Sequence, residues 1–362
     1  LTAALIGCRP TQEKQSVSCW PKLPSAGEMT VLAWYGIPSD CTSVERFEEL
    51  KNAGFTHQFT GYPDAEAMAR ALDTAERDEP SADDFAELGA WAARIRATDD
   101  AHYCYLNLFP NYAPCETLKT DSYREYVNRF DREVPLQLLS FDHYPVVGDT
   151  CRPEWYENLE IFSDEARKAG KPFWAFALAT AHEPYPIPDL AQLRLQVYSD
   201  LAYGAQGIQY FTYWTPEKNP TWDFHHAPVE RSSGRRTDVY DKIKQMNAEI
   251  RALSGVFLGC EVVSVRHTGE SIPRGTVRLT ELPDGVKKLE TTGAGAVVSE
   301  LRNGNNRFIV IVNRDFKNSM TLQIELDETA SRILKDGSVV PASIYHETMV
   351  VEPGDAMIYM FK

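Results

Sequence analysis

The sequence predicts an α/β fold: a (β/α)8 barrel followed by a C-terminal antiparallel β-sandwich. From residue 30 to about residue 253, short apolar runs alternate with amphipathic helical stretches, as in repeated strand–helix units. After residue 258 the helical stretches stop, and short strands separated by Gly, Asn and Asp turns follow. The chain has 362 residues, of which 43% are hydrophobic, and this suffices for one large domain and a smaller one.

Six apolar runs are predicted to be barrel strands. They are apolar on both faces, as a parallel sheet covered by helices requires. The predicted strands cover residues 31–36, 55–59, 103–108, 136–141, 173–178 and 208–214. The predicted helices cover residues 43–50, 64–76, 83–98, 122–131, 155–169, 190–203 and 239–253.

One part of the eight-unit pattern is missing. The helix that ends near Glu76 runs directly into Arg77-Asp78-Glu79-Pro80, with no strand between them. We therefore expect about 50 to 70 residues, carrying the third strand, its helix and most of the fourth strand, to be absent between Ala75 and Asp78 of the printed sequence. The alternative is a genuine six-stranded arrangement, whose open sheet edges proteins usually avoid.

The chain is predicted to divide into three parts. Residues 1–28 form a lipoprotein signal remnant and tether, residues 29–258 the catalytic barrel, and residues 259–362 the β-sandwich. Five strands are predicted in the sandwich, at residues 296–299, 307–312, 320–324, 348–351 and 356–360. No residue pattern in the sandwich points to catalysis.

The N-terminus has the pattern of a lipoprotein signal peptide. Leu5-Ile6-Gly7-Cys8 matches the lipobox, and a polar run follows it as far as Ser18. In this interpretation Cys8 is the acylated residue, and the protein is anchored by lipid in the bacterial cell envelope, at the outer membrane or in the periplasm. The alternative is a chance apolar octamer. The predicted contact with the membrane is through this anchor alone.

Composition restricts the possible partners. The net charge is −15 and no block of Lys or Arg is present, so nucleic acid is excluded as a partner because binding it needs a basic surface. Aromatic residues make up 11% of the chain, and their flat apolar faces suit a carbohydrate substrate. The neighbouring His225 and His226 are expected to point apart, so we do not expect them to bind a metal ion. No other cofactor is predicted.

In a (β/α)8 barrel the reacting groups lie at the carboxyl ends of the strands. Three carboxylates near these ends, Glu79, Asp142 and Glu183, are the predicted catalytic residues. Glycoside hydrolysis uses one carboxylic acid to protonate the leaving oxygen and a second carboxylate to attack the sugar or to activate water. The predicted substrate-binding residues at or after the same ends are Trp34, Tyr35, His57, Asp78, Asn107, His143, Tyr144, Tyr213, Trp214 and Trp222.

Each of the three carboxylates also has a simpler interpretation. Glu79 stands just before the helix entry at Pro80-Ser81, where a first-turn carboxylate stabilises the helix dipole. Asp142 precedes His143 and could hold that ring or a loop in place. Glu183 is followed by Pro184, and a loop carboxylate of this kind is usually solvated.

Several motifs resemble the large retaining clan of (β/α)8 glycoside hydrolases, in particular its β-galactosidase-like family 42 members. Asp78-Glu79-Pro80 is similar to the Asn-Glu-Pro that ends strand four of the clan, where the Glu is the acid/base. Asp142-His143-Tyr144-Pro145 is similar to the Asp-x-Tyr-Pro strand end of β-galactosidase-like members. The aromatic run at residues 210–214 looks like their eighth strand, whose Trp floors the sugar subsite. The N-terminus resembles that of Bacteroides-type envelope lipoproteins.

The chain departs from the clan pattern at two places. Asp78 replaces the Asn that contacts the 2-hydroxyl of the sugar. Strand seven of the clan ends in the nucleophilic Glu, whereas residues 173–179 contain no carboxylate. Either Glu183 folds back, or Asp142 supplies the second carboxylate, or the protein does not hydrolyse in the usual way. A glycoside hydrolase is therefore the leading interpretation, and a non-catalytic glycan-binding lipoprotein on a degenerate barrel is the alternative.

Overall fold

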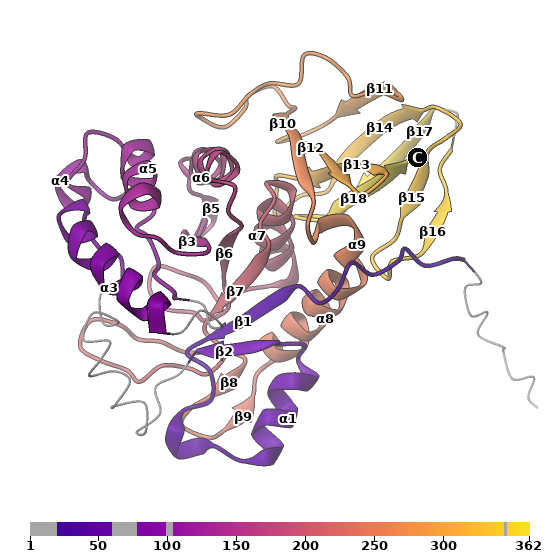
Figure 1. Cartoon of the computed structure of the whole chain (residues 1–362). Helices are drawn as coiled ribbons and strands as arrows, with labels where there is room; N and C mark the ends of the chain where they lie inside the picture. Colours follow the sequence, from indigo (N-terminus) through magenta and orange to yellow (C-terminus); the bar gives the residue numbers. More distant parts are fainter. Residues whose placement is uncertain (1–19, 60–77, 99–103, 344–345) are drawn as a thin grey trace, which may run out of the picture.

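The computed structural model describes residues 20–59, 78–98, 104–343 and 346–362. Figure 1 shows a parallel sheet surrounded by helices, beside a two-sheet β-sandwich drawn in orange and yellow. The lipobox at residues 5–8 and the helix predicted over residues 64–76 lie outside the described residues. None of the described helices is long and apolar enough to cross a bilayer.

The parallel sheet has the strand order β2-β1-β7-β6-β3, and every neighbouring pair in it is parallel. Its strands are β1 (Thr30–Trp34), β2 (His57–Phe59), β3 (Leu139–Phe141), β6 (Phe173–Leu178) and β7 (Gly207–Phe211). The first strand of the series therefore pairs with the last, which is the neighbour relation of a barrel.

Two backbone contacts extend the sheet beyond β3. Leu108 pairs with Phe141 in an isolated parallel bridge, and the amide of Glu79 donates to the carbonyl of Asn107 over 3.0 Å. Glu79 thus lies beside Asn107, where the end of a fourth strand is expected. The strand predicted over residues 103–108 is reduced to one paired residue in the part of it that the structure describes.

Within the described residues β2 pairs with β1 alone, so the edge on which a third strand is expected is open. A closed barrel stays a prediction. We expect the intact natural protein to exceed the 40.9 kDa of the printed sequence by roughly 5 to 8 kDa, the mass of the missing strand–helix–strand unit. Mass spectrometry of the natural protein measures this difference, and a mass equal to that of the printed sequence would support the six-stranded arrangement.

Helices cover the outer face of the parallel sheet (Figure 1). The first turns of four of them are closed by side-chain caps, because the free N–H groups there need acceptors. The Ser43 hydroxyl caps the first helix, and Asp189 with Gln192 forms a capping box at the start of another. The helices are α1 (Val44–Asn52), α3 (Phe85–Thr98), α4 (Cys115–Leu118), α5 (Tyr123–Glu133), α6 (Trp155–Ala169), α7 (Leu190–Ala202), α8 (Asp238–Ala252) and α9 (Ser254–Phe257).

The C-terminal part consists of a six-stranded sheet, β10-β12-β13-β18-β15-β16, and a three-stranded sheet, β11-β14-β17. The strands are β10 (Glu261–His267), β11 (Val286–Thr291), β12 (Ala296–Asn303), β13 (Asn306–Asn313), β14 (Met320–Leu326), β15 (Ser331–Ile333), β16 (Val339–Pro341), β17 (Glu347–Val351) and β18 (Ala356–Phe361). Four of them, β10, β11, β15 and β16, were not predicted, because they are short or interrupted by charged residues.

The six-stranded sheet is apolar on both faces, and its two faces serve different cores. Along β13, Phe308, Val310 and Val312 belong to the core shared with the helices around the parallel sheet. Ile309 and Ile311 belong to the core between the two sheets of the sandwich. Because successive side chains of a strand point to opposite faces, one continuous apolar run supplies both cores.

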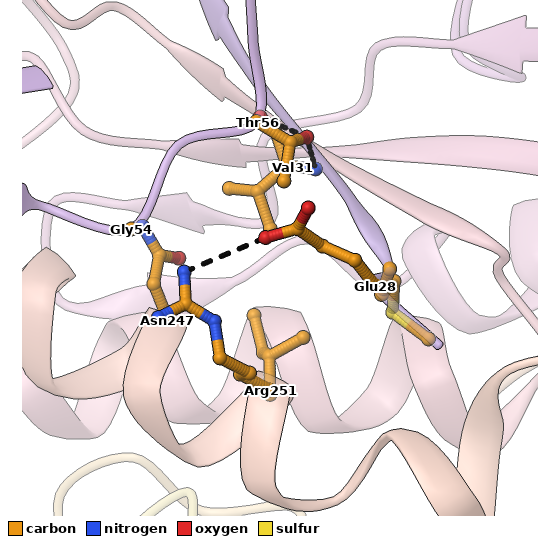
Figure 2. A pocket seen from close by; sticks show the side chains of 8 residues that line it. Glu28, Val31, Gly54, Thr56, Asn247 and Arg251 are labelled. Atoms are coloured by element: carbon orange, nitrogen blue, oxygen red, sulfur yellow. Dashed lines mark hydrogen bonds and ion pairs between the residues drawn. The ribbon is translucent and has the colours of Figure 1, made fainter. Parts of the chain in front are cut away.

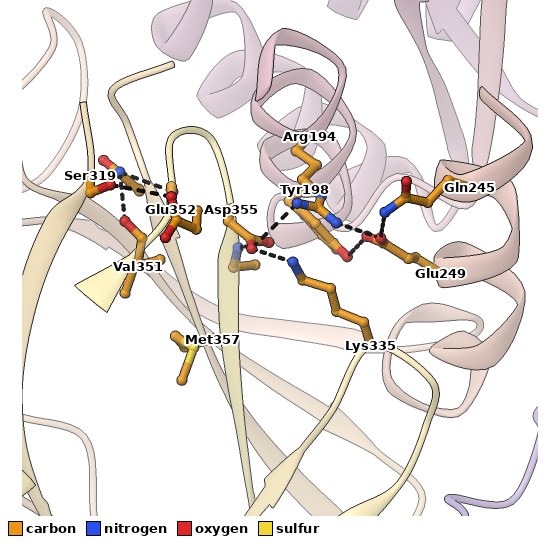
Figure 3. Close-up of polar contacts among 12 residues, drawn as sticks. Arg194, Tyr198, Gln245, Glu249, Ser319, Lys335, Val351, Glu352, Asp355 and Met357 are labelled. Carbon is orange, nitrogen blue, oxygen red and sulfur yellow. Dashed lines mark hydrogen bonds and ion pairs between the residues drawn. The ribbon is translucent and has the colours of Figure 1, made fainter. Parts of the chain in front are cut away.

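A polar cluster joins the two parts of the molecule (Figure 3). Arg194 of α7 lies 2.6 Å from Glu249 of α8 and 3.7 Å from Asp355, which precedes β18. The Tyr198 hydroxyl donates to Glu249 over 2.6 Å, and Lys335 of the sandwich pairs with Asp355. The side chains of Arg194, Glu249 and Asp355 are 13%, 8% and 9% exposed, so this cluster is largely shielded from water.

Candidate active site

Glu79 and Asp142 form a hydrogen-bonded carboxyl pair at the carboxyl edge of the sheet. Glu79 has a left-handed backbone (φ 55°), and its side chain is half-buried. Burial and the charge of Asp142 raise the pKa of Glu79. Burial and the charge of Asp78 raise the pKa of Asp142. Two carboxyl groups in contact share one proton, and we place it on Glu79, whose pKa is raised further.

A chain of hydrogen bonds across the strands holds Asp142 in place. The Asn107 amide donates to Asp142 over 2.9 Å, and the Ser140 hydroxyl donates to the Asn107 oxygen over 2.9 Å. Gln209 donates to Ser140 over 2.8 Å, and the Tyr105 hydroxyl donates to Gln209 over 2.8 Å. Among these residues only Asn107 and Asp142 were predicted. Tyr105, Ser140 and Gln209 could have been found as polar side chains inside apolar strands, since such a side chain must find buried partners.

We expect Asp142→Asn to move the alkaline limit of activity to lower pH. The substitution keeps a side chain of the same shape beside Asn107 but removes the charge that helps to raise the pKa of Glu79. Glu79 then loses its proton at a lower pH, and the alkaline limb of the kcat/KM profile shifts down by roughly 1 to 3 units. Asp83→Asn, at an exposed carboxylate nearby in the sequence, is the control. An unmoved limb would contradict the role of Asp142.

A flat aromatic surface lies at the ends of the first two strands. The rings of Trp34 and Phe59 stack with centroids 4.7 Å apart and planes 8° apart. Phe59 is 47% exposed, so the stack is accessible from solvent. His57 on β2 is also exposed, and its Nδ1 lies 2.8 Å from the Thr56 hydroxyl. Tyr35 is half-buried with φ 47°. Phe59 was not predicted as a site residue.

A second aromatic group follows β6 and β7. Trp222, which is 41% exposed, meets His182 edge to face, with centroids 5.5 Å apart. His182 also packs against Tyr185, with centroids 4.7 Å apart. Tyr144 is buried and lies edge to face with both Tyr185 and Phe176. Trp222 and Tyr144 were predicted, whereas His182 and Tyr185 were missed.

Three predicted substrate-binding residues lie in the interior. Tyr213, Trp214 and His143 are 0%, 2% and 0% exposed. The Arg46 guanidinium covers the Trp214 ring at 5.1 Å, and the Tyr112 ring meets the His143 ring edge to face at 5.0 Å. The structure shows these three residues in packing, and their contact with substrate stays a prediction.

Glu183 makes no hydrogen bond to the carboxyl pair in the described part of the chain, and its catalytic role stays a prediction. Its side chain is exposed, and its amide donates to Asp223 over 3.0 Å. The end of β6 is occupied by Thr180, whose hydroxyl lies 2.6 Å from that of Thr212. Asp78 precedes Glu79 in the sequence, and the pKa of its carboxyl is raised because burial outweighs a hydrogen bond with Asn107.

No metal site is evident in the described part of the chain. No group of three or more His, Cys, Asp and Glu side chains there is placed to hold an ion. The rings of His225 and His226 do not point apart as expected, but lie edge to face with centroids 5.2 Å apart. The Nδ1 of His225 lies 2.8 Å from the Asp223 carbonyl oxygen.

A small cavity lies at the opposite, amino end of the strands (Figure 2). Glu28 and Arg251 meet across it at 3.8 Å, and Asn247 donates to the Ala53 carbonyl over 2.8 Å. Its volume of about 10 Å³ is enough for about one water molecule. Its size and its place, away from the strand ends that carry the carboxyl pair, exclude it as the site of a sugar.

Residues 102–253 match the model of glycoside hydrolase family 42, which is described as β-galactosidase. The matched segment contains Asn107 and Asp142, but Glu79 precedes it. The match supports a glycosyl hydrolase enzyme. No curated protein sequence matches the chain significantly.

Several solved structures are similar at low identity. A β-galactosidase from the Antarctic haloarchaeon Halorubrum lacusprofundi is 18% identical, with a TM-score of 0.38 over 48% of this chain and 27% of that one. A family 42 β-galactosidase from G. stearothermophilus is 9% identical, with a TM-score of 0.44 over 74% and 65%. An Anoxybacillus α-amylase is 11% identical, with a TM-score of 0.44 over 92% and 97%. This chain therefore spans about a quarter of the haloarchaeal enzyme.

Proposed function

We propose that this protein is a glycoside hydrolase that acts on poly- or oligosaccharide, with Glu79 as the general acid. The observation that carries the proposal is the contact between Glu79 and Asp142, which keeps a proton on Glu79 near neutral pH. A glycosidic oxygen needs such a proton when its bond to the sugar breaks. The family 42 match over residues 102–253 supports the same chemistry.

Asp142 assists Glu79 in this proposal and does not attack the sugar. The two carboxyl groups of a retaining enzyme are about 5 to 5.5 Å apart, and those of an inverting enzyme about 6.5 to 9.5 Å apart. Glu79 and Asp142 are in hydrogen-bonding contact, and the charge of Asp142 raises the pKa of Glu79. We therefore assign Asp142 the role of raising the pKa of the acid.

One observation favours the alternative, a glycan-binding protein without catalysis. The described residues place Ala179 and Thr180 at the end of β6, where the resemblance leads us to expect a nucleophilic carboxylate. A panel of aryl glycosides and oligosaccharides separates the two functions, with hydrolysis and binding measured on the same samples. Release of reducing sugar supports the enzyme, whereas saturable binding without cleavage supports the binding protein.

We further propose that the protein is held at the bacterial cell envelope by lipid on Cys8. Leu5-Ile6-Gly7-Cys8 supports this placement. We expect Cys8→Ser to move the protein from the membrane fraction to the soluble fraction of its host, because stable anchoring depends on the acyl chains. Cell fractionation with immunoblotting measures the change, and Cys115→Ser, at an exposed thiol, is the control. A Cys8→Ser variant that stays with the membranes would contradict the anchor.

A further inference from the structure

We infer that Arg152 forms an anion-binding subsite beside the Glu79–Asp142 pair, and that the substrate is an acidic glycan bearing a carboxylate or a sulfate group. The inference rests on the proposed function for the identity of the reacting sugar. It adds the class of substrate, which neither the family match nor the motifs specify.

Arg152 is fixed close in sequence and in space to the segment that carries Asp142. It follows a two-residue hairpin formed by β4 (Val146–Val147) and β5 (Thr150–Cys151). Its amide donates to the Pro145 carbonyl over 2.7 Å. The hairpin therefore returns the chain to the end of β3, where Asp142 lies.

The Arg152 guanidinium lies between two aromatic side chains. Its central carbon is 4.4 Å from the centroid of the Tyr112 ring and 5.9 Å from that of the Tyr185 ring. Its Nη2 donates to the Tyr185 hydroxyl over 3.2 Å. Tyr112 is 40% exposed, so a ligand can reach this group from solvent. Two aromatic faces and a cation together suit a sugar ring that carries an acidic group.

Within the part of the chain that the structure describes, Arg152 has no carboxylate partner. The Tyr185 hydroxyl accepts the one hydrogen bond that its guanidinium donates there, and its buried Nε has no partner. Two other half-buried arginines are paired with carboxylates: Arg194 with Glu249 and Asp355, and Arg231 with Asp40 and Glu217. Arg314 also has no carboxylate partner, but its guanidinium donates to the carbonyls of Thr268, Ser271 and Ala294, whereas that of Arg152 donates to one hydroxyl alone. A half-buried guanidinium without an anion is costly, and a bound carboxylate or sulfate would offset that cost.

The two rings beside Arg152 connect it to the segment that carries Asp142. The Tyr112 ring meets the ring of His143, the residue after Asp142, edge to face with centroids 5.0 Å apart, and the Tyr185 ring meets that of Tyr144 edge to face at 5.8 Å. Asp142 is not available as the partner of Arg152, because its carboxylate is already bound to Glu79 and Asn107. An anionic group of the substrate can therefore bind Arg152 while a neighbouring glycosidic oxygen lies near Glu79.

Binding of simple sugars to the intact protein tests the inference without requiring catalysis. Galacturonic acid and glucuronic acid probe the carboxylate, galactose 6-sulfate probes the sulfate, and galactose and glucose are the neutral references. We expect at least one acidic sugar to bind about 10- to 100-fold more tightly than its neutral reference, as a hydrogen-bonded charge pair allows. The sugar that shows the preference identifies the anionic group. Equal binding of all the sugars would overturn the inference.

Two variants then assign the preference to Arg152. Arg152→Met keeps an apolar stem over Tyr112 but removes the charge, so it is expected to abolish the preference. Arg152→Lys keeps the charge and is expected to retain part of it, which separates charge recognition from a loss of folding. Circular dichroism reports folding for both, and a preference unchanged in folded Arg152→Met would overturn the inference. Acid-sugar binding that depends on Arg152 without any hydrolysis would contradict only the proposed function, whereas hydrolysis of neutral glycosides alone would contradict only this inference.

Discussion

Glu79→Gln is expected to lower kcat by about 10² to 10⁴ on glycosides with natural leaving groups, which is the usual contribution of a positioned general acid. Gln has the shape of Glu but carries no transferable proton. For activated aryl glycosides, the rate of the first step, in which the leaving group departs, should fall less, because these leaving groups depart without protonation. Steady-state kinetics on one natural and one activated substrate measure this difference.

Glu116→Gln is the matched control, since Glu116 is exposed on the short helix α4. It should leave both rates close to those of the unmodified protein. If Glu79→Gln lowers the rates on natural and activated substrates equally, Glu79 is not the general acid. If its binding of oligosaccharide is lost together with activity, the residue is structural.

Arg194→Met is expected to lower the free energy of unfolding by about 3 to 5 kcal/mol, the usual cost of leaving a buried charge unpaired. Arg194 lies 2.6 Å from Glu249 and 3.7 Å from Asp355, and these side chains are 8% and 9% exposed. Removal of the guanidinium deprives Glu249 of its cation and leaves only Lys335 beside Asp355 in the described residues. Because the cluster joins the helices around the parallel sheet to the sandwich, the loss should be seen by probes in both parts during urea denaturation.

Arg302→Met is the control for this measurement. Arg302 is 57% exposed and lies 4.0 Å from Glu261, so its removal should cost at most about 1 kcal/mol. A second variant, Arg194→Met with Glu249→Gln, removes one unpaired charge and should recover part of the stability. A loss below about 1 kcal/mol for Arg194→Met alone would show that water reaches the cluster and screens its charges.

The local elements of this protein could be predicted from its sequence. The helix around residues 44–52 begins after the Ser43 cap, and the one over residues 155–169 ends at Gly170, both close to the predicted bounds. Strand ends were also readable, because apolar runs stop where polar residues meet solvent. Asn107 was named on that ground, since the carboxyl ends of parallel strands share one edge, and Glu79 and Asp142 were named also because their motifs resemble those of the glycoside hydrolase clan.

Which of those side chains meet could be decided only by the tertiary structure. Period-two spacing places a residue on one face of a strand, but the curvature of the sheet and the neighbouring strands decide what lies opposite it. The structure therefore brings Asp142 to Glu79, leaves Glu183 exposed, and encloses Trp214 beneath Arg46. Arg152 had no sequence signal, because its significance comes from two aromatic neighbours and a missing carboxylate.

The sequence by itself thus determined most of the elements, the change from alternating strands and helices to a β-sandwich, and the strand ends where chemistry is expected. These depend on residues close together in the chain. The tertiary structure decided the partners of each functional group. A carboxyl group becomes an acid near neutral pH through burial and a second charge, and residues 79 and 142 acquire both only when strands distant in sequence lie side by side.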